Sequence, residues 1–283
     1  MRLLHVLLIV LITAAPVPLL AGDTYKLSML PRYSSEEINR RINPLANYLT
    51  QKTGASIETV ITSDFAQYEK RLQNGSIQIG YENPYIYTLV SESHEALAMA
   101  VKGKDGDKFR GIVIARKDSG LSTLQDLRGK TISIVGPTSA GGYLSQKLSL
   151  MEAGIDIEAE CTIMEAVDNK QENVIFAVYT GEADAGFIRE SALHQADSYI
   201  SASQIKVLSE CAWLPNWSFS VDRTLPEKVK KGIQAALLNL EPDHPVMKAL
   251  KIERFKLATD SDYDTVRRAS GTIEAKNSSE SLK

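Results

Sequence analysis

The chain has 283 residues and a formal net charge of -3, from 32 basic and 35 acidic side chains. Hydrophobic residues make up 43% of it, which is enough for a folded core and excludes disorder of the whole chain. The near-neutral charge argues against a nucleic-acid-binding face, which usually carries a basic excess. With two cysteines and four histidines, a zinc ribbon or a disulfide-rich scaffold is excluded, and we expect no metal or cofactor.

The first 21 residues have the pattern of an export signal. Arg2 precedes a nearly unbroken apolar stretch over residues 3–12, which is followed by a small-residue exit ending at Ala21. The alternative is a membrane anchor, but Pro16 and Pro18 interrupt the roughly 20 apolar residues that a span needs. We therefore predict a signal peptide over residues 1–21 and an exported protein.

Strands and helices alternate along the rest of the chain. The predicted strands cover residues 25–30, 56–62, 77–81, 96–101, 111–115, 131–135, 161–166, 183–188, 206–208 and 219–221. Predicted helices start at the Ser34 and Asp64 caps, near Tyr85, at 124, after the 136–142 loop, at 173 and at Pro226. The polar tail 277–283 is predicted to be disordered.

Repeated strand–helix units predict an α/β fold with mostly parallel sheets and helices on both faces. About 260 residues arranged in this way fit two lobes better than one sheet. No repeat or low-complexity linker separates the lobes, so we expect strands that cross between them. Ligands in such folds bind outside the carboxyl ends of strands, where helix N-termini point.

The segment from Thr131 to Tyr143 is the strongest candidate for a binding site. A buried strand leads through a loop of glycines and hydroxyl residues directly into a helix, whose first N–H groups and dipole favour an anion. The alternative is an ordinary strand–helix loop. Gly142 stands where a phosphate-binding P-loop needs lysine, and Pro137 stands where a nucleophile elbow needs glycine. His94 and His194 stand in no motif and favour structural roles, which disfavours a secreted hydrolase.

Three further segments at strand ends are candidate walls of a binding site. Pro84, Tyr85 and Tyr87 lie at a strand-to-helix junction, where tyrosines can bind a polar ligand or pack in the core. Arg189 can bind an anion with two hydrogen bonds, or pair with Glu190 or a surface carboxylate, and such an ion pair is the favoured alternative. An aromatic segment ending at Trp217 can line a pocket or pack between the lobes.

Cys161 and Cys211 are 50 positions apart. Export makes a disulfide between them chemically possible. Both cysteines also adjoin apolar strand residues, where buried free thiols are common. The sequence leaves both alternatives open.

These segments, in this order, resemble the phosphate/phosphite/phosphonate-binding periplasmic proteins of ABC transporters. The resemblance covers nearly the whole chain after residue 21 and rests on residues 42–49, 83–87, 110–120, 124–130, 181–186 and 259–264. It implies a type II two-lobed periplasmic binding protein fold with a ligand cleft between the lobes and no catalysis. It also implies a periplasmic location. We expect lobe 1 to comprise residues 22–117 and 211–276, and lobe 2 residues 118–210.

The sequence departs from the family pattern at the expected ligand site. Ser139-Ala140-Gly141-Gly142 stands in place of Ser-Thr-Ser-Gly, and Thr138 partly replaces the lost hydroxyls. Gln171, Phe65 and Trp217 stand where the family commonly has His, Tyr and Asp. The expected ligand-binding residues are Phe65, Pro84, Tyr85, Tyr87, Thr138, Ser139, Ala140, Gly141, Gly142, Arg189 and Trp217.

The resemblance favours a periplasmic solute-binding protein, which captures a small ligand such as a phosphonate-like oxyanion for an inner-membrane ABC permease. The alternative is a sensory binding protein of the same fold that reports its ligand to a membrane histidine kinase. In either case we expect a monomer that binds no nucleic acid. A protein with net negative charge must bind an anion through local donors.

Overall fold

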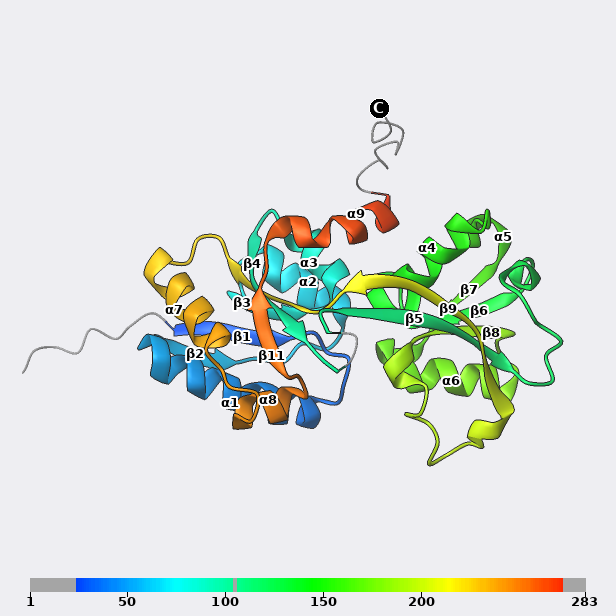
Figure 1. The fold of residues 1–283 in the computed structure, drawn as a ribbon, viewed down its shortest axis with the longest axis horizontal. Coiled ribbons are helices and arrows are strands. Elements are labelled where there is room, and N and C mark those ends of the chain that lie inside the picture. The colour runs from blue at the N-terminus through cyan, green and yellow to red at the C-terminus, as the bar shows by residue number, and fades with distance from the viewer. Residues whose placement is uncertain (1–23, 104–105, 272–283) are drawn as a thin grey trace, which may run out of the picture.

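The computed structural model describes residues 24–103 and 106–271. The predicted signal peptide and the predicted disordered tail lie outside the described residues. The chain forms two lobes side by side, and two long strands run from one lobe towards the other (Figure 1). This confirms the expected two-lobed α/β architecture.

Lobe 1 is built on a six-stranded mixed sheet. Its strand order is β11 (Arg254–Leu257), β4 (His94–Val101), β10 (Ser218–Asp222), β3 (Ile79–Glu82), β1 (Thr24–Met29) and β2 (Ser56–Thr59). Strands β10 and β11 run against the other four. The sheet is flanked by α1 (Ser35–Thr53), α2 (Phe65–Gln73), α3 (Pro84–Val90), α7 (Glu227–Leu238) and α8 (Pro245–Leu250).

Lobe 2 is built on a five-stranded mixed sheet. Its order is β7 (Thr162–Glu165), β6 (Thr131–Ile134), β8 (Ala185–Arg189), β5 (Lys108–Arg116) and β9 (Ile205–Pro215). Strand β5 runs against the other four. The flanking helices are a π-helical turn η2 (Ala140–Leu144), α4 (Ser145–Glu152), α5 (Ile157–Glu160) and α6 (Gln171–Thr180).

Local sequence signals explain where the first two helices begin and end. The Ser34 hydroxyl accepts a hydrogen bond from the Glu37 N–H at 3.3 Å, and Asp64 accepts one from the Gln67 N–H at 2.8 Å. Gly54 ends α1 with φ 73°, a left-handed conformation that glycine adopts without strain. Both predicted caps are confirmed, so these helices start where their N–H groups find side-chain acceptors.

The expected lobe boundaries are wrong at two places. Residues 108–116 and 211–215 were expected in lobe 1, but β5 and β9 pair in the sheet of lobe 2. The crossings therefore lie between β4 and β5 and between β9 and β10. The expectation failed because antiparallel pairing of β5 with β8 and β9 leaves no mark in the local sequence pattern.

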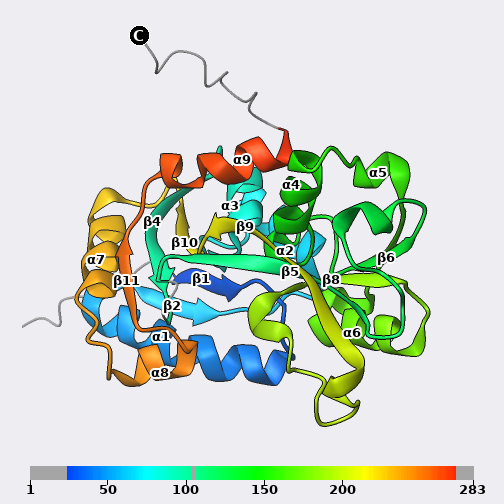
Figure 2. The same cartoon turned by 45° about the vertical axis from the view of Figure 1, so that its right-hand side comes forward.

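Three elements near the C-terminus were not predicted: α8, β11 and α9 (Asp264–Ser270). Helix α9 packs on α3 of lobe 1 and also on α4, β9 and η2 of lobe 2 (Figure 2). Within the described ranges, no helix is long and apolar enough to cross a membrane.

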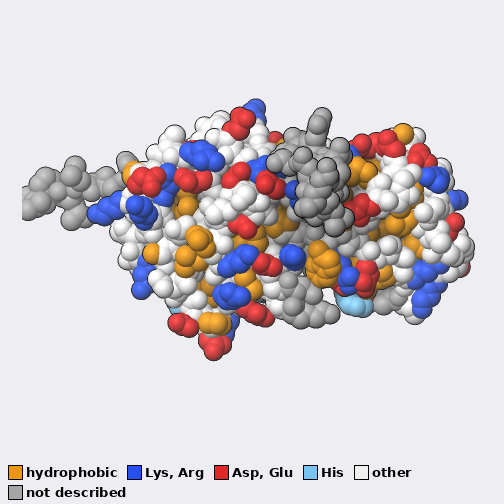
Figure 3. Space-filling view, turned by 45° about the horizontal axis from the view of Figure 1, so that its top comes forward, with side chains coloured by type: hydrophobic (Ala, Val, Ile, Leu, Met, Phe, Trp, Pro, Cys, Tyr) orange, Lys and Arg blue, Asp and Glu red, His pale blue; other side chains and the backbone are white. Residues whose placement is uncertain are grey.

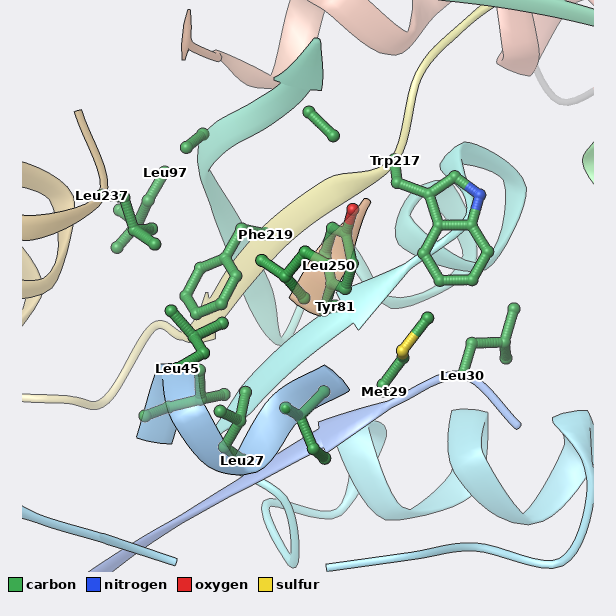
Figure 4. Packing of buried hydrophobic residues seen from close by; sticks show 14 of the residues in the cluster. Leu27, Met29, Leu30, Leu45, Tyr81, Leu97, Trp217, Phe219, Leu237 and Leu250 are labelled. Carbon is green, nitrogen blue, oxygen red and sulfur yellow. The ribbon is translucent and has the colours of Figure 1, made fainter. Parts of the chain in front are cut away.

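The largest hydrophobic cluster belongs mainly to lobe 1 but includes Phe109, Ala140, Leu144 and Leu214 of lobe 2, and two smaller clusters lie within lobe 2. The large cluster of lobe 1 joins the inward faces of α1, α7 and α8 to the sheet (Figure 4). Trp217 lies at the edge of this cluster, and its ring meets that of Tyr81 edge to face at 5.2 Å. Cys161 and Cys211 are both free, which decides against the disulfide.

Candidate functional site

A small pocket lies between the two lobes, where the carboxyl ends of several strands meet. We call it the inner pocket. Lobe 1 and the crossings supply Leu30, Arg32, Phe65, Asn83, Phe109 and Trp217; lobe 2 supplies Ser139, Ala140, Gly141, Gln171 and Arg189. The predicted site residues Phe65, Ser139, Ala140, Gly141, Arg189 and Trp217 are thus brought together from distant parts of the chain.

The wall from lobe 2 is the loop between β6 and the η2 turn. The Ser139 hydroxyl accepts a hydrogen bond from the Gly142 N–H at 3.1 Å and so caps this turn. A hydroxyl that accepts one bond still has its own hydrogen to donate. A Cβ at Gly141 would lie 3.0 Å from both Arg189 and Phe109, so glycine permits close packing at this position. The loop therefore presents a hydroxyl and a bare backbone to the pocket.

Asn83 forms part of the opposite wall and links the two lobes. Its side-chain oxygen caps α3 by accepting from the Tyr85 and Ile86 N–H groups at 2.8 and 3.0 Å. Its side-chain nitrogen donates to the Thr138 carbonyl across the cleft at 3.1 Å. One side chain thus begins a helix of lobe 1 and holds the loop of lobe 2.

Arg189 departs from the expected ion pair. Glu190 instead binds Arg110, with two hydrogen bonds of 2.9 Å. The Arg189 guanidinium lies over the Phe109 ring, 3.9 Å from its centroid, and its polar contact is a 3.4 Å hydrogen bond to Asn216. Burial and the charge of Arg32 lower the pKa of Arg189 to about 9, so it is still protonated at pH 7. No carboxylate of the described chain neutralises it.

Arg32 is a second cation in the same pocket, and sequence analysis missed it. Its guanidinium lies near the rings of Tyr33 and Trp217, at 4.8 and 5.6 Å from their centroids. Its Nε is buried without a hydrogen-bond partner among the described residues. A buried donor left unpaired costs free energy, which a ligand acceptor would recover.

Five predicted site residues lie outside this pocket. Tyr87 is fully buried, donates to Asp260 at 2.8 Å and packs on Tyr263, because α3 turns this face towards the C-terminal segment. Thr138 contributes its carbonyl to Asn83, not its hydroxyl to the pocket. Pro84 is buried at the start of α3, Tyr85 packs against the core of lobe 1, and Gly142 packs behind the loop.

Gln171 was noted as a departure from the family pattern but not as a site residue. Its side-chain oxygen accepts from the Arg189 backbone N–H at 2.8 Å, while the side chain lines the pocket. This hydrogen bond holds the backbone of Arg189 in place, and so helps to position its guanidinium group. Arg32, Asn83 and Phe109 also line the pocket; among these, the cap pattern at Asn83 was a usable signal, and nothing local singles out Arg32.

Lys170 makes a second connection across the cleft. It precedes α6 in lobe 2, and its ammonium group donates to the Tyr33 and Pro31 carbonyls of lobe 1 at 2.9 and 3.3 Å. Together with the bond from Asn83 to Thr138, it closes the lobes on each other. The structure therefore represents a closed conformation of the cleft.

The buried histidine of lobe 1 lies away from the cleft. His94 Nδ1 lies 3.1 Å from the Ser220 hydroxyl, but both side chains are fully buried and neither lines the cleft. No group of three or more His, Cys, Asp or Glu side chains in the described ranges is arranged to hold a metal ion. On the face seen in Figure 3, acidic and basic side chains are interspersed.

A family model described as "ABC transporter, phosphonate, periplasmic substrate-binding protein" matches residues 27–263. The chain belongs to this family. Members are periplasmic substrate-binding components of transporters, and the match spans both lobes and the inner pocket.

Individual relatives are distant. The chain is 26% identical over 178 residues to the phosphate-import protein PhnD of Mycolicibacterium smegmatis, covering 58% of this chain and 54% of that one. It is 24% identical over 182 residues to the tetrathionate sensor histidine kinase TtrS of Salmonella typhimurium, covering 62% of this chain and 29% of the kinase. The matches thus span about half of the first relative and under a third of the second.

A solved structure with a bound ligand has the same fold. PhnD1 of Prochlorococcus marinus, in complex with methylphosphonate, superposes with a TM-score of 0.76 at 13% identity, covering 88% of this chain and 97% of that one. At this identity the likeness establishes the fold alone.

Proposed function

We propose that this protein is a periplasmic solute-binding protein that captures a small oxyanion of the phosphonate type for an ABC-type permease. The observation that carries the proposal is the pair Arg32 and Arg189, which face one interlobe pocket without a carboxylate partner among the described residues. Guanidinium groups match the geometry of phosphoryl oxygens, and an anion between two of them supplies the missing counter-charge.

The mechanism follows from where the donors lie. Arg32 belongs to lobe 1, whereas Ser139 and Arg189 belong to lobe 2. An anion bound by both sets is held fully only when the lobes are closed, so binding favours the closed state by its differential contacts. Nothing in this arrangement requires a bond of the ligand to be broken.

The location and export route are part of the same proposal. The family is periplasmic, and the predicted signal peptide over residues 1–21 supplies the route. The permease is the expected partner and the binding protein is expected to act as a monomer. The match to a sensor histidine kinase favours one second candidate, a binding protein that reports its ligand to a kinase.

The test is calorimetric titration of the purified mature chain with phosphate, phosphite, methylphosphonate, sulfate and methanesulfonate. We expect at least one phosphorus oxyanion to bind with micromolar or tighter affinity and to raise the melting temperature. If none of the five binds, the oxyanion proposal is wrong. The genes that flank this one separate transport from sensing, since a permease gene supports the first and a kinase gene the second.

A further inference from the structure

A second, more basic chamber adjoins the inner pocket on its solvent side. This outer chamber shares Arg32, Arg189 and Trp217 with the inner pocket. Arg41, Lys102 and Lys251 also line it, and Lys251 is paired with Glu37 at 3.6 Å. It opens to solvent, and the space between its atoms, open solvent included, is about 420 Å³, compared with about 290 Å³ measured in the same way for the inner pocket. The cleft therefore has room for a ligand that extends beyond the oxyanion held inside.

The charges of the outer chamber are not balanced by the protein. Arg41 is paired with Glu37 at 2.7 Å, but no ion pair of the described chain neutralises Arg32, Lys102 or Arg189. A small oxyanion in the inner pocket reaches Arg32 and Arg189 but leaves Lys102, which lines the outer chamber and not the inner pocket. One phosphonate group thus leaves one cation of the cleft without a partner.

Two titrating groups register this excess of positive charge. The nearby charge of Arg32 lowers the pKa of the Tyr33 hydroxyl although burial opposes the change. Burial and the charge of Arg189 lower the pKa of the Lys102 ammonium. The shift of Tyr33 is the one that a net positive potential produces, and at Lys102 the charge of Arg189 adds to the effect of burial. A second anion in the chamber would oppose both effects of charge.

The outer chamber also has apolar walls that can contact a hydrocarbon part of a ligand. Tyr33, Tyr81 and Trp217 line it, together with the apolar side chains of Met29, Leu250 and Ile252. A hydrocarbon segment between two charged groups would rest on these side chains.

We propose that the natural ligand is an elongated organic dianion, with a phosphonate-type group in the inner pocket and a second anionic group in the outer chamber near Lys102. This inference rests on the proposed function, because it assigns the substrate class of the same cleft. It excludes inorganic phosphate as the best ligand.

The test compares two isosteric compounds by calorimetric titration. In 3-phosphonopropionate the second group is a carboxylate, and in 3-methylbutylphosphonate two methyl groups replace the carboxylate oxygens. We expect 3-phosphonopropionate to bind at least tenfold more tightly than 3-methylbutylphosphonate. Methylphosphonate is titrated alongside, because its binding reports on the inner pocket alone.

The variant Lys102→Gln locates the second charge. Lys102 is exposed to solvent, although its ammonium group is partly desolvated, so the substitution does not disturb the core. It is expected to reduce the preference for 3-phosphonopropionate at least fivefold. Lys228→Gln, a substitution of an exposed lysine on α7, is the matched control for the loss of one positive charge and is expected to keep the preference.

The outcomes separate the two proposals. If methylphosphonate binds but 3-phosphonopropionate and 3-methylbutylphosphonate bind with equal affinity, the inference of a second anionic group is overturned and the proposed function stands. An unchanged preference in Lys102→Gln overturns the placement of the second group in the outer chamber. If neither methylphosphonate nor either isostere binds, the proposed function and the inference that rests on it both fail.

Discussion

Two arginines on neighbouring strands of lobe 2 show how differently the protein treats the same side chain. Arg110 on β5 stacks on Trp213 and is paired with both Glu190 and Glu210, and its hydrogen bonds to Glu190 raise its pKa. Arg189 on β8 stacks on Phe109 but has no carboxylate partner among the described residues. Where charge serves the fold, the chain supplies the counter-charge itself. In the cleft it leaves that place to a ligand.

The strongest test of this comparison is to remove each arginine in turn. We expect Arg189→Gln to weaken binding of the best oxyanion of the titration panel about 100-fold, since it loses charge-assisted hydrogen bonds worth ~1.5–3 kcal/mol each. Its melting temperature should stay close to that of the wild type, because no ion pair is lost. Arg110→Gln should do the opposite and lower the melting temperature with affinity changed less than twofold. Equal losses of affinity in the two variants would contradict the assignment.

A buried carboxyl in lobe 1 shows a third way of treating a charged side chain. It has no cation of the described chain beside it and is kept neutral by a proton. Glu82 is fully buried, one of its oxygens accepts from the Tyr68 hydroxyl at 2.9 Å, and the other has no partner among the described residues. Burial raises the pKa of Glu82 from its usual 4.5 to about 8. The protonated form therefore predominates at pH 7 in the folded state.

The raised pKa of Glu82 predicts the sign of a pH effect on stability. A carboxyl whose pKa is higher in the folded state adds to the free energy of unfolding. This contribution is complete below pH 4.5 and is lost as the pH rises through 8. Between pH 7 and pH 9 the free energy of unfolding should fall by about 1.4 kcal/mol from this group. In Glu82→Gln this part of the fall should vanish in urea titrations at the two pH values. If the free energy of unfolding falls by the same amount between pH 7 and pH 9 in both proteins, Glu82 is not the cause of the fall.

The smallest expected effect concerns closure. Lys170 binds carbonyls of lobe 1 from lobe 2 and does not line the inner pocket. Lys170→Met should weaken oxyanion binding about fivefold, mainly through faster dissociation, because two hydrogen bonds of the closed state are lost. Lys147→Met, which removes the surface pair with Glu158, is the matched control. Stopped-flow dissociation rates would decide, and equal rates in wild type and Lys170→Met would remove Lys170 from the closing contacts.

Sequence analysis predicted the features that local patterns encode. The caps at Ser34 and Asp64 and the loop from Ser139 to Gly141 all lie where expected, since each depends on neighbouring residues. Phe65 was placed through the family resemblance and Trp217 already through its aromatic segment, and both line the pocket.

The features that escaped prediction depend on partners far away in the chain. Tyr87 was expected in the site, but its partner Asp260 lies 173 residues away and draws it into the core. Arg189 was expected to pair with its neighbour Glu190, yet Arg110 across the sheet binds that carboxylate. Arg32 follows β1 in an unremarkable turn, and only the approach of lobe 2 makes it part of a binding site. Pairing between distant side chains is decided by tertiary packing, which no local pattern records.

Helix α9 gives the motion of the lobes a further constraint. It follows Tyr263 and packs on α3 of lobe 1, and it also packs on α4, β9 and the η2 turn of lobe 2. The η2 turn is the same segment that carries Ala140 and Gly141 into the pocket. Any hinge rotation must therefore slide or detach this helix as well as break the contacts across the cleft. Because the C-terminal helix packs on the outer side of the ligand-binding loop, the extent to which the lobes can open depends on how far this contact can shift.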